Sequence, residues 1–293
     1  MRDSRGMGQA GNRGGRSPRG RPGFCPRFFL EREPQHSGVP GAGAVLGSDV
    51  VLGAEDSHHA LKVLRVREGD CCEVVASSGD VYAAVVSAAT GPVRVKLSAR
   101  LDGAAAGAVY RTQVGVVQAL ARPSVMDYVI EKGTEVGACF FLLVPAAGSA
   151  RLKEDAAAER LVRWRRIARE AAKQSKQTAL PWVDIAESVG DGLDRMAGKG
   201  SMTVILEPEA LSDLRYVLRA ALPRQEVSGG RTVSGLPSGV SLWVGPESGW
   251  TEAELELFLA GGATTARLGQ AVLRAETAGP VAVAVARFEL GDW

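Results

Sequence analysis

The sequence predicts an α/β protein in which a mainly parallel sheet domain follows a small antiparallel β-barrel. Short strand-like runs separated by turn residues occupy the chain from residue 24 to about 100. From about residue 110 onward, apolar runs of strand length alternate with helical stretches, which is typical of a parallel sheet covered on both faces. With 293 residues, 45% of them hydrophobic, the chain is long enough for two modest domains.

The first 23 residues consist mostly of Gly, Arg, Ser and Pro, and we expect them to form a disordered tail. They hold six arginines and one aspartate, so their net charge is +5 and the chain's +2 leaves −3 for the other 270 residues. The net positive charge of the chain therefore comes from this tail. It could bind RNA phosphates weakly, or it could simply be a solvated extension.

Cysteine and histidine usage argues against metal-cluster and disulfide-framework proteins. The four cysteines include no C-x-x-C pair, and the chain has only three histidines. We therefore expect no metal site and a reducing compartment, the cytoplasm. The chain also lacks an apolar stretch long enough to span a bilayer, so we expect no membrane association.

The first domain is predicted over residues 24–103. The aromatic run "FCPRFFL" and the segment from 71 to 100 give its strands, with "SSGD" and "TGP" as turns. Between them, Asp56 or Ser57 is expected to cap a short helix. That helix should turn three apolar side chains inward, Ala60, Leu61 and Leu64, and expose five others: His58, His59, Lys62, Arg65 and Arg67. The exposed set could grip a phosphate backbone, or it could be merely solvated.

The second domain is predicted over residues 104–293. Its expected strands are the apolar runs "TQVGVVQAL", "CFFLLVPA", "TVILEPEA", "VSLWVGPE" and "ATTARLG". A helix is expected over about 155–177, with an inward stripe made of Leu161, Trp164, Ala168 and Ala171. Away from this stripe lies a basic face made of Arg165, Arg166, Arg169 and Lys173. RNA contact and simple solvation are equally compatible with that face.

The turn "GPESG" at 245–249 directly follows a buried apolar run. Thr251 and Glu254 have the spacing of a capping box, so a helix should begin just after Trp250 and present its free N–H groups to the turn. Gly245 would let a ligand approach the backbone closely. The side chain of Glu247 could accept a hydrogen bond from a ribose hydroxyl or an amine. Alternatively, its charge could simply be stabilised by the positive end of the helix.

Two further strand ends are expected at the same edge of the sheet. One strand ends at Leu268–Gly269, followed by a helix from about Thr277 that carries Pro280 in its first turn. "LEP" at 206–208 supplies the other. Because ligands bind outside the carboxyl ends of parallel strands, the sequence predicts that these turns form a single site.

Six motifs occur in an order that resembles the RsmE-type 16S rRNA uridine-N3 methyltransferases of the SPOUT class. These are "RFF" at 27–29, "HHALKVLRVREGD" at 58–70, "EKGTEVG" at 131–137, "RWRRIAREAAKQS" at 163–175, "GPESG" at 245–249 and "LGQAVLRAETA" at 268–278. The resemblance covers essentially residues 27–290. The chain departs from the family pattern at Ser248, at Ala275 and near Gln177, which concerns the RNA-facing contacts more than the cofactor pocket.

The resemblance implies a PUA-like RNA-binding barrel followed by an α/β SPOUT domain with a trefoil knot. It implies a homodimer that binds S-adenosyl-L-methionine in the knot and methylates N3 of a uridine in 16S ribosomal RNA of the small subunit. The knot follows from the resemblance alone, because general folding rules make knots rare.

The candidate site residues fall into three groups. Cofactor binding is expected from Leu206, Glu207, Pro208, Gly245, Pro246, Glu247, Ser248, Gly249, Leu268, Gly269, Val272, Leu273 and Thr277. RNA binding is expected from Arg27, His59, Lys62, Arg65, Arg67, Arg122, Lys132, Arg166 and Gln174. Arg274 is the candidate for stabilising a developing uracil anion, and Glu276 is the weaker candidate for a proton acceptor. A structural salt bridge between these last two is the alternative.

Two other classes of function compete with this assignment. A nucleotide-dependent metabolic enzyme would account for the α/β half, but G-x-G-x-x-G is absent and the barrel would have no role. A non-catalytic ribosome-assembly protein that retains the fold would need only the RNA surface. That alternative predicts loss of the cofactor glycines, and they are present at 245, 249 and 269.

Overall fold

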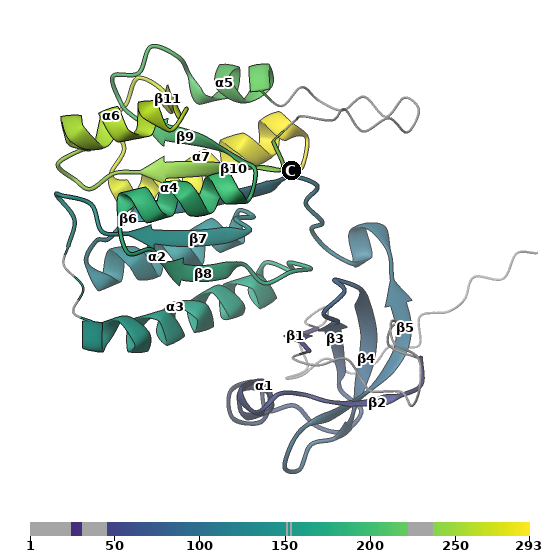
Figure 1. The fold of residues 1–293 in the computed structure, drawn as a ribbon. Helices are drawn as coiled ribbons and strands as arrows, with labels where there is room; N and C mark the ends of the chain where they lie inside the picture. The colour runs from purple at the N-terminus through teal and green to yellow at the C-terminus, as the bar shows by residue number, and fades with distance from the viewer. Residues whose placement is uncertain (1–24, 31–45, 151, 153, 222–236) are drawn as a thin grey trace, which may run out of the picture. The chain divides into compact units, whose positions relative to one another are not determined.

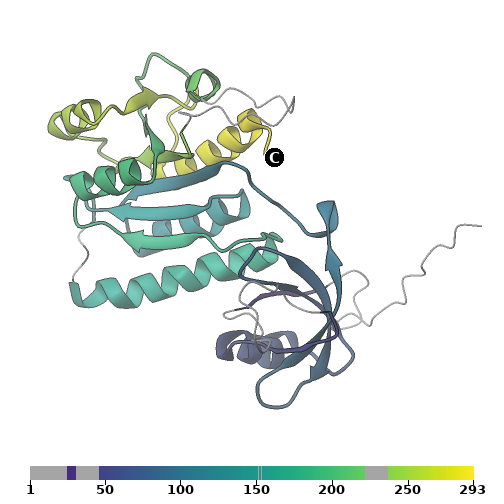
Figure 2. The same ribbon diagram turned by 45° about the vertical axis from the view of Figure 1, so that its right-hand side comes forward.

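The computed structural model describes residues 25–30, 46–150, 152, 154–221 and 237–293. The disordered tail expected over residues 1–23 lies outside this part of the chain. The chain divides into two compact units, Met1–Ala106 and Gly107–Trp293 (Figures 1 and 2).

The first unit is built on a five-stranded curled sheet with the order β1-β3-β4-β5-β2. Its strands are β1 (Arg27–Phe29), β2 (Asp49–Val51), β3 (Cys71–Val75), β4 (Val81–Ala88) and β5 (Arg94–Leu101). The meander expected over 71–100 is confirmed. The sheet is mixed rather than wholly antiparallel, because β1 runs parallel to β3. A short 3-10 turn, Gly103–Ala105, follows β5.

A short helical segment closes one side of this sheet, and it begins earlier than expected. Helix α1 (Ala54–His58) starts after Gly53 and continues as a π-helical turn, η2 (His59–Leu64). The expectation that Asp56 or Ser57 caps the helix is wrong, because both are buried inside α1. The Ser57 hydroxyl donates to the carbonyl of Leu52 at 3.1 Å and accepts from the N–H of Val93 at 3.0 Å. It therefore ties the helix to the sheet.

The second unit contains a six-stranded, entirely parallel sheet with the order β11-β9-β10-β6-β7-β8. Its strands are β6 (Gln113–Ala119), β7 (Phe140–Val144), β8 (Trp182–Ile185), β9 (Ser201–Leu206), β10 (Gly239–Val244) and β11 (Thr264–Ala266). The five expected strands are confirmed, and β8 is an addition. β10 lies between β9 and β6, whereas the next strand, β11, pairs with the other side of β9. The order in which strands are added across the sheet therefore reverses at β10.

Helices cover both faces of this sheet, as Figure 1 shows. They are α2 (Pro123–Glu135), α3 (Glu154–Gln174), α4 (Val189–Gly198), α5 (Leu214–Ala221), α6 (Glu252–Ala260) and α7 (Ala275–Leu290). α2, α3, α5 and α7 pack together around one apolar core, whereas α4 and α6 cover the other face. Among the described residues, no helix is both long and apolar enough to cross a membrane.

Helix α3 presents the expected stripe to the core, since Trp164, Ala168 and Ala171 are buried. One member of the expected basic face is not on the surface. Lys173 is 7% exposed, and its ammonium group contacts the Glu170 carboxylate at 2.7 Å. Burying the long aliphatic stem while pairing the charge is an arrangement that helical spacing alone does not predict.

Helix α7 begins two residues before the expected start, so Pro280 lies further from the start of the helix than expected. With the first residue at Ala275, Pro280 lies in the second turn rather than the first. Proline has no N–H, so the carbonyl of Glu276 loses its usual helical donor. The start of α7 is thereby less constrained by helical hydrogen bonds than the rest of the helix.

Candidate functional site: a pocket at the carboxyl ends of three strands

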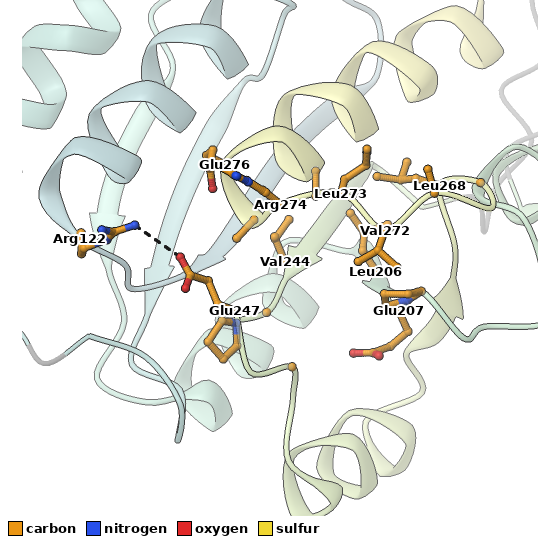
Figure 3. Close-up of a pocket in the computed structure, with 18 residues that line it drawn as sticks. Arg122, Leu206, Glu207, Val244, Glu247, Leu268, Val272, Leu273, Arg274 and Glu276 are labelled. Carbon is orange, nitrogen blue, oxygen red and sulfur yellow. Dashed lines mark ion pairs between the residues drawn. The ribbon is translucent and has the colours of Figure 1, made fainter.

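Three neighbouring strands end at the same level of the sheet. Leu206, the last residue of β9, pairs in register with Val244 of β10 and with Ala266 of β11. Because the strands are parallel, the segments that follow them leave from one edge. They enclose a pocket of about 570 Å³, shown in Figure 3, which is in the usual size range of small-molecule sites.

The turn after β10 is fixed by its own backbone and by helix α6. Gly249 adopts φ +78° and donates its N–H to the carbonyl of Pro246 at 2.9 Å. At Gly245, an added Cβ would lie 3.1 Å from the Trp250 indole, so a side chain there would crowd the ring. The expected capping box is confirmed, with Thr251 and Glu254 exchanging hydrogen bonds at the start of α6.

Glu254 also ties this turn to the loop after β7. Its Oε1 accepts the N–H of Ala147 at 2.8 Å, while Oε2 accepts the N–H and the hydroxyl of Thr251. Partial burial raises the pKa of Glu254, but these hydrogen bonds outweigh burial and leave the pKa below its ordinary value. The carboxylate is therefore held ionised, and it joins the start of α6 to the loop after β7.

The segment from β11 to α7 forms the second wall. Its first residue, Arg267, pairs with Asp213 at 2.7 Å, and the backbone N–H of Arg267 donates to the carbonyl of Ser212 at 2.9 Å. Gly269 then adopts φ +154°, and the segment ends at Arg274, the N-cap of α7. The loop is thus anchored at both ends, and its middle borders the pocket.

Most of the candidate cofactor residues border this pocket. Eleven of the thirteen do so: Leu206, Glu207, Pro208, Gly245, Pro246, Glu247, Gly249, Leu268, Gly269, Val272 and Leu273. The other two, Ser248 and Thr277, do not. The Ser248 hydroxyl faces Gly148, and the Thr277 N–H closes the first turn of α7 by donating to the carbonyl of Arg274. Whether the eleven bind a cofactor stays a prediction.

The pocket also includes residues that the sequence did not suggest for this role. They are Val244, Ala271, Ala275, Ala278 and, from the group expected to bind RNA, Arg122. Val244 could have been identified as the last residue of an expected strand. The alanines belong to the loop and to the first turn of α7, which begins earlier than expected.

Both candidate catalytic residues lie at the start of α7 and line the pocket. Figure 3 shows Arg274 and Glu276 close to each other on the same wall. The alternative of a structural salt bridge is not realised, since no ion pair joins them among the described residues. Neither side chain has a charged partner in the described part of the chain, so both remain available to a ligand.

Two other acids border the pocket in different surroundings. Glu247 faces Arg122 at 3.7 Å, and both side chains are about three-quarters exposed, so this ion pair is weak (Figure 3). Glu207 is more enclosed. Burial raises its pKa, and the nearby charge of Glu209 raises it further.

The candidate RNA residues are placed unevenly. In the first unit, Lys62, Arg65 and Arg67 are exposed and His59 is half-buried. Arg27 does not reach the surface: its side chain is 1% exposed and pairs with Glu73 at 2.8 Å.

In the second unit, Arg166 and Gln174 are exposed on α3, as expected for residues that could meet RNA. Lys132 is held by Glu131 and Glu135, each at 2.8 Å. Within the described residues, no cluster of three or more His, Cys, Asp or Glu has the geometry of a metal site.

Two solved structures with the same fold are described as methyltransferases. The chain aligns with a ribosomal RNA small subunit methyltransferase E from Neisseria gonorrhoeae, solved with S-adenosyl methionine, at TM-score 0.69 and 22% identity, covering 90% of this chain and 98% of that one. A Legionella pneumophila putative methyltransferase aligns at TM-score 0.70 and 19% identity, covering the same shares. The expected SPOUT-type α/β fold with a PUA-like first unit is confirmed. The knot stays a prediction.

Curated relatives cover most of the chain. The Bacillus subtilis ribosomal RNA small subunit methyltransferase E is 29% identical over 86% of this chain and 92% of its own length. The protein of the same name from Mycobacterium tuberculosis is 29% identical over 87% of this chain and 90% of its own.

Family models account for both units. A model described as an RNA methyltransferase PUA domain matches residues 52–97, and one described as an RNA methyltransferase domain matches residues 110–287. The second model alone spans more than half of the chain. The protein therefore belongs to the RNA methyltransferase family whose curated relatives carry the name ribosomal RNA small subunit methyltransferase E.

Proposed function

We propose that this protein transfers a methyl group from S-adenosyl-L-methionine to N3 of a uridine in 16S ribosomal RNA. The observation that carries the proposal is the convergence of the loops after β9, β10 and β11 on one pocket that is bordered by Arg274 and Glu276. The names of the curated relatives support ribosomal RNA of the small subunit as the substrate. Such a substrate implies action in the cytoplasm.

The pocket suits a nucleoside cofactor in size and in chemistry. Leu206, Val244, Leu268, Val272 and Leu273 supply an apolar lining for a planar base. Gly249 and Gly269 adopt conformations that side chains rarely accept, so ligand atoms can approach the backbone there. These two walls would hold the cofactor, whose sulfonium centre supplies an activated methyl group when bound.

The remaining chemistry falls to the protein's own residues. Uracil N3 carries a proton and is a poor nucleophile until that proton leaves. When N3 bonds to the methyl carbon, the carbon–sulfur bond breaks, the N3 proton passes to an acceptor, and S-adenosyl-L-homocysteine remains. Holding the reacting atoms in line can supply up to about 7 to 11 kcal/mol of the barrier.

Arg274 is placed to stabilise the negative charge that develops on the uracil carbonyl oxygens. Its guanidinium is exposed at the pocket, and no described acid neutralises it. Glu276, two residues further along α7, is the candidate to take the N3 proton. Glu276 lies in the first turn of α7, at the helix end that attracts negative charge.

RNA would be held through both units. The exposed cations Lys62, Arg65 and Arg67 of the first unit are suited to phosphates, and Arg122 of the second unit is close enough to the pocket to contact the target nucleotide. Arg27 is not proposed to contact RNA, because its side chain is buried and paired with Glu73. Lys132 is weakened as a candidate because two carboxylates already neutralise it.

Calorimetric titration with S-adenosyl-L-methionine tests the proposal. We expect binding with a dissociation constant of about 1 to 100 µM, which corresponds to roughly −8 to −5.5 kcal/mol. Absence of binding would favour a non-catalytic ribosome-assembly protein that keeps the fold and the RNA surface. Mass spectrometry of 16S RNA treated with the protein would then identify the modified nucleotide and the ring position.

We further propose that the protein is a homodimer. The outward side of α7 and the segment after it leave Val281, Phe288 and Trp293 exposed, the last two by 64% and 71%. Large apolar side chains gathered on one surface are typical of protein interfaces. Light scattering at micromolar concentration should give twice the chain mass, and Phe288→Asp should shift it toward the monomer. A monomer mass for the unmodified protein would contradict the proposal.

A further inference from the structure

Glu207 is the acid of the pocket whose charge nothing in the described structure offsets. Glu247 has Arg122 at 3.7 Å, and Glu276 lies in the first turn of α7, where the helix end favours a negative charge. Glu207 follows a strand rather than starting a helix, and the charge that acts on it is that of another acid, Glu209. No described residue forms an ion pair or a side-chain hydrogen bond with it.

The backbone fixes where this carboxylate lies. The N–H of Glu207 donates to the carbonyl of Ala266 at 3.0 Å, and its own carbonyl accepts the N–H of Ala210 at 3.1 Å. Both main-chain groups are thus committed, one to the strand ladder and one to the turn. Figure 3 shows the side chain directed inward from the tip of β9, on the far side of the pocket from Arg122.

The half-buried carboxylate can accept hydrogen bonds from water while the pocket is empty, so a ligand that displaces this water must supply donors in its place. The two arginines of the neighbouring segment do not supply them: Arg267 is paired with Asp213 at 2.7 Å, and Arg274 forms no ion pair with Glu207 in the described structure. Two parts of the proposed cofactor have the required chemistry. The ribose offers two adjacent hydroxyl donors, and the methionine end offers an ammonium group.

We propose that Glu207 is a specificity-determining residue that accepts hydrogen bonds from donor groups of the nucleoside ligand, the ribose diol or the α-ammonium group. This inference rests on the proposed function, since it assigns a role within the same pocket. A carboxylate can accept two parallel hydrogen bonds, so it would discriminate against ligands that lack the donors.

The test compares Glu207→Gln with Glu209→Gln, a matched control. Glu209 is exposed on the same loop and does not border the pocket. Binding would be measured by competition against labelled S-adenosyl-L-methionine, with three competitors. S-adenosyl-L-homocysteine carries both the diol and the ammonium group, 5′-methylthioadenosine carries the diol alone, and its 2′-deoxy analogue carries only one hydroxyl.

If the diol is the partner, Glu207→Gln should weaken S-adenosyl-L-homocysteine and 5′-methylthioadenosine about 10- to 100-fold and the deoxy analogue much less. If the ammonium group is the partner, only S-adenosyl-L-homocysteine should weaken. Glu209→Gln should behave as the unmodified protein in both cases. Unchanged affinity of Glu207→Gln for every competitor overturns the inference and leaves the proposed function intact. Failure of the unmodified protein to bind any competitor would contradict both the inference about Glu207 and the proposed function.

The pH dependence of binding gives a second readout that a purely structural role would not change. Burial raises the pKa of Glu207, and donors that bind the ionised carboxylate lower it again. Binding should therefore release a proton, and affinity should fall as pH falls through the raised pKa of the free protein. The unmodified protein and Glu207→Gln share the other ionisable side chains of the pocket, so these contribute equally to both pH profiles. They are Arg122, Glu247, Arg274 and Glu276. Glu207→Gln should lose this part of the pH dependence, and a retained dependence would contradict the inference.

Discussion

Replacing Arg274 with alanine is expected to abolish methyl transfer while leaving the affinity for S-adenosyl-L-methionine within a few fold. Arg274 is the N-cap residue of α7 and borders the pocket, and its backbone carbonyl, not its side chain, accepts the first hydrogen bonds of the helix. Alanine keeps those backbone bonds and removes only the charge. Loss of a group that stabilises a developing anion typically lowers kcat by about 10²- to 10³-fold.

Single-turnover methylation of the RNA substrate, together with calorimetry of cofactor binding, would separate these two effects. Arg274→Lys is the matched variant, because it keeps a positive charge but loses the planar fork of donors. We expect it to retain a small part of the activity. Turnover by Arg274→Ala at the rate of the unmodified protein would remove this residue from the mechanism, whereas a large loss of cofactor affinity would reassign it to binding.

The fold of the second unit could be predicted because its signals are local. Each expected strand is a short apolar run bounded by turn residues, and three of them end where glycine or proline follows. Parallel strands bring such ends together at one edge, so the pocket followed from the order of elements. The elements that were missed, β8, α4 and α5, are short, four, ten and eight residues, and carry weaker patterns.

Individual side chains were harder to predict, because burial depends on residues far away in the chain. Arg27 is buried by pairing with Glu73, which lies 46 residues later. Ser57 was expected at a helix end but bonds the N–H of Val93, 36 residues away. In each case the partner lies far along the chain and is brought close by the sheet, so the local sequence does not predict where the side chain lies.

Arg287 is a larger example of the same effect, and it was not identified from the sequence. It lies in the last turn of α7 with no exposed surface. Its guanidinium donates to the carbonyl of Gly137 at 2.7 Å and 3.0 Å, to that of Thr112 at 2.7 Å, and to Asp292 at 3.2 Å. It also lies 3.8 Å from the ring centre of Tyr110. One side chain thus joins the start of β6, the loop before β7 and the C-terminal segment.

Arg287→Ala should therefore lower the free energy of unfolding by about 3 to 5 kcal/mol, because it leaves two carbonyls without this donor and the buried carboxylate of Asp292 with the N–H of Thr112 but no cation. Denaturant unfolding followed by circular dichroism would measure the loss. Arg163→Ala is the control: Arg163 pairs with Asp127 at 2.7 Å but is 61% exposed, so water replaces its partner and the unfolding midpoint should barely move. Arg287→Lys should fall between the two, since lysine restores the charge without the fork. If Arg287→Ala were no more destabilising than Arg163→Ala, the buried guanidinium would contribute no more than a surface ion pair, and the ordering of these segments would have to come from apolar packing alone.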